Sequence, residues 1–310
     1  MPNALDAFRV YLENISLPDS QIVSAQRSNT ALRDYLVNDP YFGGFTKDTF
    51  LNGSYARRTV IRPIRDVDII VVVDTDWMKA DPSRAMESLR RKLSHHYDEF
   101  RTRRKRRAVR VSLSEIDLDV VLAVAPDGID QPLLIPDREQ RTWIKTWPKR
   151  QMTLVGVLGA KAGGNYTRLV RVLKAWARAR VAAPDRPRSF LFECAVYHVL
   201  AADPAAFIGE MDAALETLLE RMYEWNFGRG KTLFRWGDPL VEDPALPNVN
   251  VARDWTSEGA DRLKEKIGLA LSKLDKVHRS LYDETEIGHW GDILGPPFPA
   301  ASTVGRRVRQ

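Results

Sequence analysis

Residues 51–59 read LNGSYARRT, and residues 65–73 read RDVDIIVVV. The second segment is almost continuously β-branched from Val67 onward, which predicts a buried strand. Asp66 and Asp68 stand two residues apart at its start, so their side chains project to the same side of the strand. Carboxylates held together on a buried strand repel each other unless a cation lies between them. Hard divalent cations such as Mg2+ prefer oxygen ligands of this kind, so the pair predicts a metal site.

Two neighbouring features extend this site. A turn made by Gly53 and Ser54 would offer backbone N–H groups and a hydroxyl to phosphate oxygens, and glycine lets the backbone come close to them. A strand predicted at residues 116–124 carries Asp117 and Asp119. Asp119 lies in the more apolar part of that strand and is assigned to the site, whereas Asp117 is nearer the strand mouth and is expected to be solvated. Three such carboxylates with two metal ions could activate a ribose hydroxyl and stabilise a pyrophosphate leaving group.

Each of these signals has a plainer explanation. An Asp-x-Asp pair alone is often a capped turn with solvated carboxylates, and only its combination with Gly53-Ser54 and Asp119 argues for a site. A basic segment follows, in which the cations are Arg101, Arg103, Arg104, Lys105, Arg106, Arg107 and Arg110. This segment is either a solvated turn or a contact for phosphate or nucleic acid.

The composition describes an ordinary soluble globular chain of 310 residues, 44% hydrophobic and 28% charged, with a net charge of +6. A basic balance favours polyanionic partners such as nucleoside triphosphates, nucleic acid or acidic membrane surfaces. The chain has one cysteine, which excludes a disulfide framework and argues against a cysteine metal site. We find no apolar run long enough to span a membrane and no secretory signal, so a cytoplasmic protein is expected.

The hydrophobic periodicity predicts an α+β fold in which an α/β lobe is followed by a helical lobe. The predicted strands are residues 45–51, 67–73, 108–113 and 116–124, and the predicted helices of this part are residues 3–17, 20–37 and 82–97. After Pro136 we expect helices at 153–159, 167–180, 190–201, 204–227 and 255–282, with a loop at 236–254. The predicted organisation is N-terminal helices that brace both lobes (1–40), a core (41–135), a helical lobe (136–295) and a flexible tail (296–310).

At this point the residues resemble a known family. Gly53-Ser54, Asp66-x-Asp68 and Asp119 look like the active site of polymerase-β-type nucleotidyltransferases. The flanking sequence is similar to the bacterial branch related to cGAS and DncV, the CD-NTases. The resemblance therefore implies a polymerase-β-like nucleotidyltransferase lobe with a C-terminal helical lobe.

Three later segments carry the same resemblance. Residues 165–176, NYTRLVRVLKAW, are similar to the family helix whose lysine reaches the triphosphate. Residues 188–193, RSFLFE, are similar to a family helix start, and residues 241–252 to a loop near the base. By this resemblance Lys174, Ser189 and Asp243 bind the nucleotide, and Ser189 is also the N-cap of its helix. From the residues alone, Lys174 could equally be a solvated helix position.

The resemblance implies a metal-dependent enzyme that makes a cyclic di- or trinucleotide second messenger in antiphage (CBASS) defence. Its substrates would be nucleoside triphosphates and its cofactors two Mg2+ or Mn2+ ions. An accessory regulator is compatible with it, nucleic acid is not required, and a monomer is the default expectation. Some members are conjugated through a small C-terminal residue, whereas this sequence ends in Arg309-Gln310, so that regulation is not inferred.

Two rival functions stay open. The same carboxylates would serve linear nucleotidyl transfer, such as oligoadenylate-like synthesis or addition to an RNA end. A catalytically silent module that binds nucleic acid through residues 101–110 is a third hypothesis, against which the intact acidic residues argue. The sequence leaves open the bases used, the ring size and linkage, the activating signal and the oligomeric state.

Overall fold

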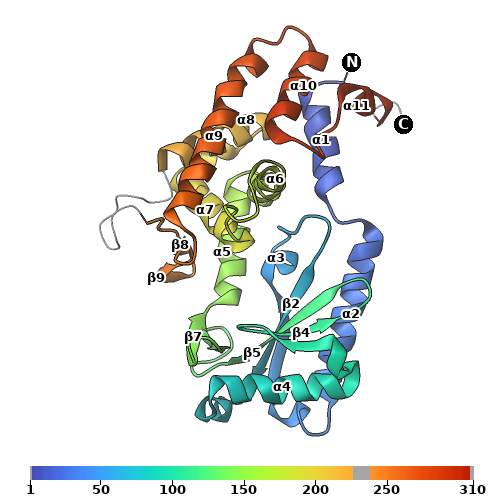
Figure 1. The fold of residues 1–310 in the computed structure, drawn as a ribbon, viewed down its shortest axis with the longest axis vertical. Helices are drawn as coiled ribbons and strands as arrows, with labels where there is room; N and C mark the ends of the chain where they lie inside the picture. The colour runs from blue at the N-terminus through green and yellow to red at the C-terminus, as the bar shows by residue number, and fades with distance from the viewer. Residues whose placement is uncertain (1, 226–237, 308–310) are drawn as a thin grey trace. The chain divides into compact units, whose positions relative to one another are not determined.

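The computed structural model describes residues 2–225 and 238–307 of the chain (Figure 1). These form two compact units. The sheet unit comprises Leu17–Met152, and the helical unit combines Met1–Ser16 with Thr153–Gln310. The helical unit is therefore discontinuous in sequence, because its first segment precedes the whole sheet unit. No helix in the described part of the chain is long and apolar enough to cross a membrane.

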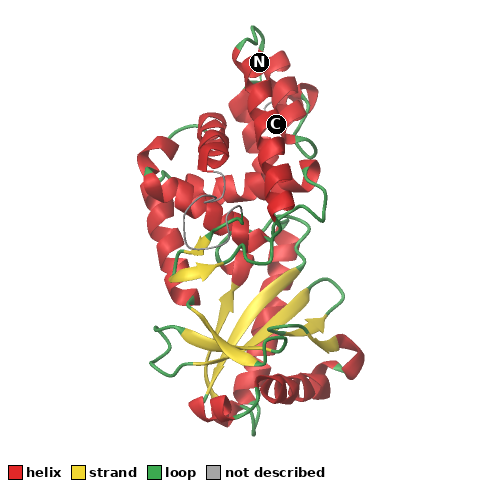
Figure 2. Cartoon of the chain, turned by 60° about the vertical axis from the view of Figure 1, so that its left-hand side comes forward, coloured by secondary structure: helices red, strands yellow, loops and turns green. Residues whose placement is uncertain are grey.

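The sheet unit is built around a mixed sheet, which has seven strands within the described residues (Figure 2). Five of them follow the spatial order β1-β2-β5-β4-β3, and β6 and β7 continue from β5. β2 and β5 run parallel, and the other neighbouring strands run antiparallel. The strands are β1 (Thr46–Asn52), β2 (Asp66–Val73), β3 (Thr102–Arg104), β4 (Val109–Ser112), β5 (Asp117–Val124), β6 (Leu133–Asp137) and β7 (Thr142–Thr146).

Alternation along the strands gives the sheet two different faces. On one face, Ile69 of β2 lies in a large apolar core with Leu36 of α2 (Asp19–Asn38) and Leu89 of α4 (Pro82–Tyr97). Side chains at the alternate positions of β2, such as Ile70, point to the opposite face and belong to a separate and smaller apolar cluster. The helices α2 and α4 thus supply the main core on one face and leave the other face to different side chains.

The predicted elements of the sheet unit are present, and each end lies within one residue of its predicted position. Three strands were not predicted, namely β3, β6 and β7. β3 reads Thr-Arg-Arg at the edge of the sheet, where charged residues are common and periodicity gives no signal. β6 contains Pro136, at which we expected the α/β region to end. Pro136 pairs with Trp143 of β7, beyond the single residue pair that joins β6 to β5, so its missing N–H leaves the central ladder intact.

The helical unit is organised around α6, which is buried along most of its length and packs against several other helices of the unit. The first helix joins the helical unit through aromatic packing, since the ring centroid of Phe8 lies 4.9 Å from that of Trp290 in a T-shaped arrangement. The elements are α1 (Ala4–Ile15), α5 (Pro148–Lys161), which includes the boundary between the units, α6 (Asn165–Arg180), α7 (Ser189–Ala202), α8 (Met211–Trp225), β8 (Glu242–Asp243), β9 (Leu246–Asn250), α9 (Ser257–His278), α10 (Asp283–Leu294) and α11 (Ala301–Arg307).

Here the structure differs from the predicted elements in several places. The helix predicted at 153–159 is longer, since α5 begins at Pro148 and ends at Lys161. The helix predicted at 204–227 is a 3-10 turn followed by α8, with Gly209 at a φ of +125° between them, and its last two residues lie outside the described residues. The predicted loop at 236–254 contains the β8-β9 hairpin, although residues 236 and 237 also lie outside the described part. The predicted helix 255–282 ends at His278, and α10 follows it. The tail, expected to be flexible, contains α11, whose Val304 is buried.

Asp137, at the end of β6, is the fully buried centre of a polar cluster in the sheet unit. It accepts hydrogen bonds from the Nε atoms of Arg106 and Arg107, both as short as 2.8 Å. It also accepts the backbone N–H groups of Glu139 and Gln140 at 3.1 and 3.0 Å. Burial acts to raise the pKa of Asp137, but these hydrogen bonds outweigh it and hold the pKa below its usual value.

We predict that Asp137→Ala lowers the free energy of unfolding by about 3–5 kcal/mol, because two guanidinium groups then lose a buried counter-charge. Glu139→Ala is the matched control, since Glu139 contacts Arg106 at 3.2 Å but is largely exposed. Its expected cost is below about 1 kcal/mol. Urea unfolding followed by circular dichroism measures both, and equal losses in the two variants would contradict the prediction.

Candidate active site

Four aspartates lie side by side at the start of the two parallel strands of the sheet unit. Asp66 is the register partner of Asp117, and Asp68 is the partner of Asp119. They share the parity of Ile70, so they lie on the face away from the core made with α2 and α4. Asp119 is buried and Asp117 is partly exposed, as their positions along the strand predict.

Crowding of these carboxylates is visible at Asp68. Burial, followed by the neighbouring charges of Asp66 and Asp119, raises the pKa of Asp68 to about 6. Burial and Asp119 also raise the pKa of Asp66, against the opposing effect of Arg110. We call the surface formed by Asp66, Asp68, Asp117 and Asp119 the acidic face. Its central residue, Asp68, therefore has too little positive charge nearby.

Gly53 begins the short helix α3 (Gly53–Ala56) and presses directly against Asp68. Its backbone has a φ of +70°, which favours glycine, and a Cβ built there would lie 1.8 Å from Oδ2 of Asp68. Ser54 follows in the same turn and is partly buried. The structure thus brings Gly53, Ser54, Asp68 and the other predicted carboxylates of the sheet unit together.

Sequence reasoning missed two cations of this site. Arg110 of β4 donates to Asp119 through Nε at 2.8 Å and Nη2 at 2.9 Å, and to Asp66 through Nη2 at 2.6 Å. Its Nη1 donates to Asp117 at 2.6 Å. Lys105 donates to Oδ2 of Asp119 at 2.5 Å. Pairing of β4 with β5 places Arg110 opposite Asp119. That register cannot be predicted from one sequence, so the contact could not be found there.

These contacts set the charge state of the buried carboxylate. Burial acts to raise the pKa of Asp119, but hydrogen bonds from Arg110 and Lys105 outweigh it, and the pKa lies below its usual value. The same contacts raise the pKa of Arg110, with Asp119 as the largest contributor. Asp119 is therefore an anion at neutral pH despite its burial.

The basic segment is largely used inside the sheet unit. Its ion pairs include Arg104 with Glu87, Lys105 with Asp119, Arg106 and Arg107 with Asp137, and Arg110 with Asp66, Asp117 and Asp119. Arg101 and Arg103 are exposed. A solvated turn does not describe this segment, because most of its charges neutralise buried or half-buried carboxylates.

The acidic face has the chemistry of a divalent-cation site but not its geometry. Across residues 2–225 and 238–307, no three Asp, Glu, His or Cys side chains are gathered as ligands of one metal ion. At the acidic face the guanidinium of Arg110 lies among the carboxylates and supplies positive charge there. The available donors are carboxylate oxygens, which Mg2+ and Mn2+ prefer. These residues fit such a cation once the Arg110 side chain makes room for it.

The other predicted residues belong to the helical unit. Lys174 is buried and donates to Oε1 of buried Glu193 at 2.7 Å, so it is not the solvated residue of the alternative interpretation. Ser189 is exposed at the first position of α7, and Arg188 rather than Ser189 occupies the N-cap. Asp243 is buried in β8 and accepts the N–H of Ala245 at 2.9 Å, a local turn contact.

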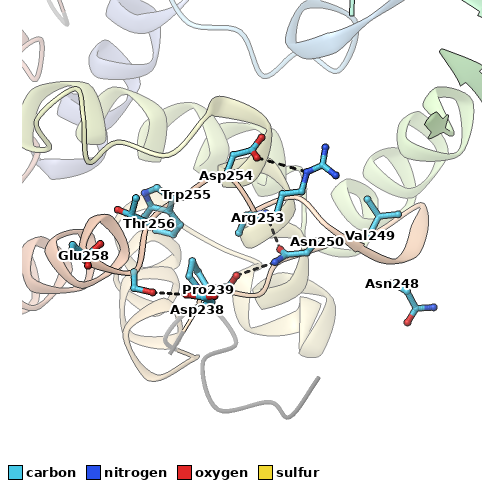
Figure 3. Close-up of a pocket in the computed structure, with 12 residues that line it drawn as sticks. Asp238, Pro239, Asn248, Val249, Asn250, Arg253, Asp254, Trp255, Thr256 and Glu258 are labelled. Carbon is cyan, nitrogen blue, oxygen red and sulfur yellow. Dashed lines mark hydrogen bonds and ion pairs between the residues drawn. The ribbon is translucent and has the colours of Figure 1, made fainter. Parts of the chain in front are cut away.

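A pocket of about 730 Å³ lies beside the β8-β9 hairpin and the start of α9 (Figure 3). Its lining includes Asn248 and Asn250, from the segment that resembles the base-contacting loop, but not Asp243. Asn250 braces the hairpin, because its Nδ2 donates to the carbonyl of Pro239 and its Oδ1 accepts the N–H of Ala252. The structure does not group the nucleotide-binding residues predicted for this unit into that pocket.

The chain is similar to proteins that make cyclic oligonucleotides. Residues 3–155 match the model of the Second Messenger Oligonucleotide or Dinucleotide Synthetase domain. Over 305 residues the chain is 26% identical to the cyclic AMP-AMP-AMP synthase of Acinetobacter sp. (strain ATCC 27244 / 9458), covering 94% of this chain and 84% of that protein.

Two solved structures show the same fold. CdnC of E. coli MS115-1 with ATP has a TM-score of 0.79 at 19% identity, covering 97% of this chain and 99% of that one. CdnC in its complex with HORMA-deltaN has a TM-score of 0.77 at 20% identity, covering 96% and 98%. These likenesses confirm the predicted α+β fold, with a polymerase-β-like lobe and a helical lobe.

We predict that Gly53→Ala destabilises the sheet unit by about 1–3 kcal/mol, because the new methyl group strains a positive φ and displaces the carboxylate of Asp68. Gly44→Ala is the control, since a Cβ at Gly44 meets nothing within 4 Å. Thermal unfolding followed by circular dichroism compares the two. A Gly53→Ala variant as stable as Gly44→Ala would show that the turn tolerates a side chain.

We also predict that Glu193→Ala costs about 3–5 kcal/mol of stability, because it removes the carboxylate that Lys174 contacts in the interior. The double variant Lys174→Met/Glu193→Leu replaces both charges by apolar groups and is expected to lie within about 1 kcal/mol of the wild type. Urea unfolding measures both. A double variant at least as unstable as Glu193→Ala would mean that the pair does more for stability than neutralise each other's buried charge.

Proposed function

We propose that the chain, which belongs to the bacterial CD-NTases and is therefore a nucleotidyltransferase, joins nucleoside triphosphates into a cyclic di- or trinucleotide at the acidic face. The observation that carries this proposal is the lateral pairing of Asp68 with Asp119 on parallel strands, with Gly53 pressed against Asp68. The Acinetobacter relative supports a cyclic trinucleotide made from ATP as the product to test first.

In this proposal Asp66, Asp68 and Asp119 are the catalytic carboxylates and hold two Mg2+ or Mn2+ ions. Bound there, such ions would promote ionisation of a ribose hydroxyl and neutralise charge on the pyrophosphate leaving group. The raised pKa of Asp68 supports the assignment, since a carboxylate with too little counter-charge gains most from a cation. Asp119 contributes a carboxylate that Arg110 and Lys105 hold in place.

The remaining nucleotide contacts are proposed from the family resemblance. Gly53 and Ser54 would receive phosphate oxygens through the backbone N–H groups and the hydroxyl of the turn that begins α3. Lys174, Ser189 and Asp243 remain proposed nucleotide-binding residues of the helical unit. Ser189 has the strongest local argument, because the first turn of α7 presents backbone N–H groups that lack helical partners.

The biological setting is also part of the proposal. We propose that the product is a second messenger in antiphage (CBASS) defence, made in the cytoplasm by a monomer. An accessory protein is proposed to regulate synthesis, because CdnC of E. coli was solved in complex with HORMA-deltaN. Nucleic acid is not required by this proposal, since most cations of the basic segment already pair with carboxylates.

The deciding experiment incubates the purified protein with four radiolabelled nucleoside triphosphates and Mg2+ or Mn2+, followed by phosphatase treatment and chromatography. A phosphatase-resistant product that a 3′-exonuclease cannot degrade supports cyclic synthesis, and omission of one base at a time identifies its composition. A product that the exonuclease degrades would replace the proposal with linear transfer. If no product forms, the assay is repeated with a HORMA-type protein and then with RNA.

We predict that Asp66→Asn/Asp68→Asn abolishes product, by at least about a hundredfold, because two of the three proposed metal-binding carboxylates become neutral amides. Its melting temperature should not fall by more than a few degrees, since the substitution relieves carboxylate repulsion at Asp68. Asp76→Asn/Asp127→Asn removes the same charge from exposed positions and should keep full activity. Retained synthesis in the first variant would end the assignment of this site.

A further inference from the structure

Arg110 is not one of the proposed metal ligands, yet it contacts three of the four carboxylates of the acidic face. The side chain is only 12% exposed, and each of its three nitrogens donates to a carboxylate. Nε and Nη2 form a two-pronged contact with Asp119, Nη2 also reaches Asp66, and Nη1 reaches Asp117. Two of these three carboxylates are proposed metal ligands, whereas Asp117 is not.

We propose that Arg110 is a positioning residue that acts as an internal counter-cation in competition with divalent metal, and that Asp117 is the carboxylate that retains Arg110 when metal binds. This inference rests on the proposed function, in which Asp66, Asp68 and Asp119 hold the metal. It adds a residue that controls how strongly they do so.

The competition follows from the occupancy of the carboxylate oxygens. Oδ2 of Asp119 accepts from both Arg110 and Lys105, so both of its lone pairs are engaged. Oδ1 of Asp119 and Oδ2 of Asp66 each accept from Arg110 as well. A divalent cation that approaches these oxygens meets a positive charge within about 3 Å of them, in a partly buried setting where such repulsion is weakly screened.

Asp117 differs from the other two carboxylates in the Arg110 nitrogen from which it accepts a hydrogen bond. Its partner Nη1 contacts neither proposed ligand, whereas Nε and Nη2 make the contacts with Asp119 and Asp66. The guanidinium can therefore keep Asp117 while it releases the other two carboxylates. Without Asp117, the charge of Arg110 would be compensated by the proposed metal ligands alone, and it would compete more strongly.

The test measures Mn2+ affinity of the nucleotide-free full chain, from the electron paramagnetic resonance signal of free Mn2+. Removing the charge in Arg110→Gln is expected to tighten Mn2+ binding by roughly tenfold or more. Asp117→Asn is expected to weaken it by roughly threefold to tenfold. Arg103→Gln is the matched control, because Arg103 is the exposed cross-strand neighbour of Arg110, and it should change the affinity less than about twofold.

A double-variant cycle separates this role of Asp117 from direct metal ligation. If Asp117 acts only through Arg110, then Arg110→Gln/Asp117→Asn binds Mn2+ like Arg110→Gln. If the double variant loses as much affinity relative to Arg110→Gln as Asp117→Asn loses relative to the wild type, Asp117 is itself a ligand and its proposed role is overturned. Unchanged or weaker binding by Arg110→Gln overturns the competition.

Melting temperatures supply a second readout that does not depend on catalysis. Arg110→Gln should melt lower than the wild type without metal and gain more from added Mn2+, because its carboxylates lack the internal cation. If Arg110→Gln does not fold, Arg110→Lys takes its place. A lysine cannot reach three carboxylates at once and should bind Mn2+ about threefold tighter than the wild type.

These outcomes distinguish the inference from the proposed function. If Asp66→Asn/Asp68→Asn binds Mn2+ as well as the wild type, the proposed metal site is wrong and this inference falls with it. If that variant loses Mn2+ but Arg110→Gln gains nothing, the metal site stands and only the role of Arg110 is overturned. Absence of Mn2+ binding by both the wild type and Arg110→Gln overturns both.

Discussion

Repulsion among four aspartates is the constraint around which the sheet unit is arranged. Parallel pairing of β2 with β5 brings Asp66 and Asp68 beside Asp117 and Asp119. Such a cluster is costly in a folded protein unless cations are close, and the chain provides Arg110 and Lys105 for this purpose. Their positions follow from the antiparallel addition of β4 to the other side of β5. The strand order therefore determines which cations neutralise the aspartates.

The register of β2 against β5 is held by apolar side chains rather than by the aspartates. Ile69, Val71 and Leu122 face the core shared with α2 and α4, so a slip of one residue would turn these side chains out of that core. The same alternation sends the aspartates to the other face. The packing of α2 and α4 on one face of the sheet thus fixes the positions of the carboxylates on the opposite face.

The parts that could be predicted from the sequence are those in which a local pattern has one physical outcome. The β-branched run after Asp66 predicted a buried strand, and the position of Asp119 in the more apolar part of the next acidic strand distinguished this buried residue from the more exposed Asp117. Arg110 could not be placed, because its role depends on which strand pairs with which. Strands β3 and β7 escaped prediction for a related reason, since edge strands are only half buried and carry no clear period. The interior of α6 was half predicted: Lys174 was singled out, but its buried partner Glu193 comes from another helix.

The discontinuity of the helical unit has a consequence for how the chain is synthesised. Residues 17–152 are contiguous, so the sheet unit can complete its sheet as soon as β7 has left the ribosome. Phe8 packs against Trp290 and Phe298, which emerge almost at the end of translation. The helices α6 and α8 also contact α1 and can cover part of its apolar face once they are made, but the ring of Phe8 must wait for α10. A chain stopped before α10 would leave Phe8 without these aromatic partners and would expose part of the apolar surface of α1 to aggregation.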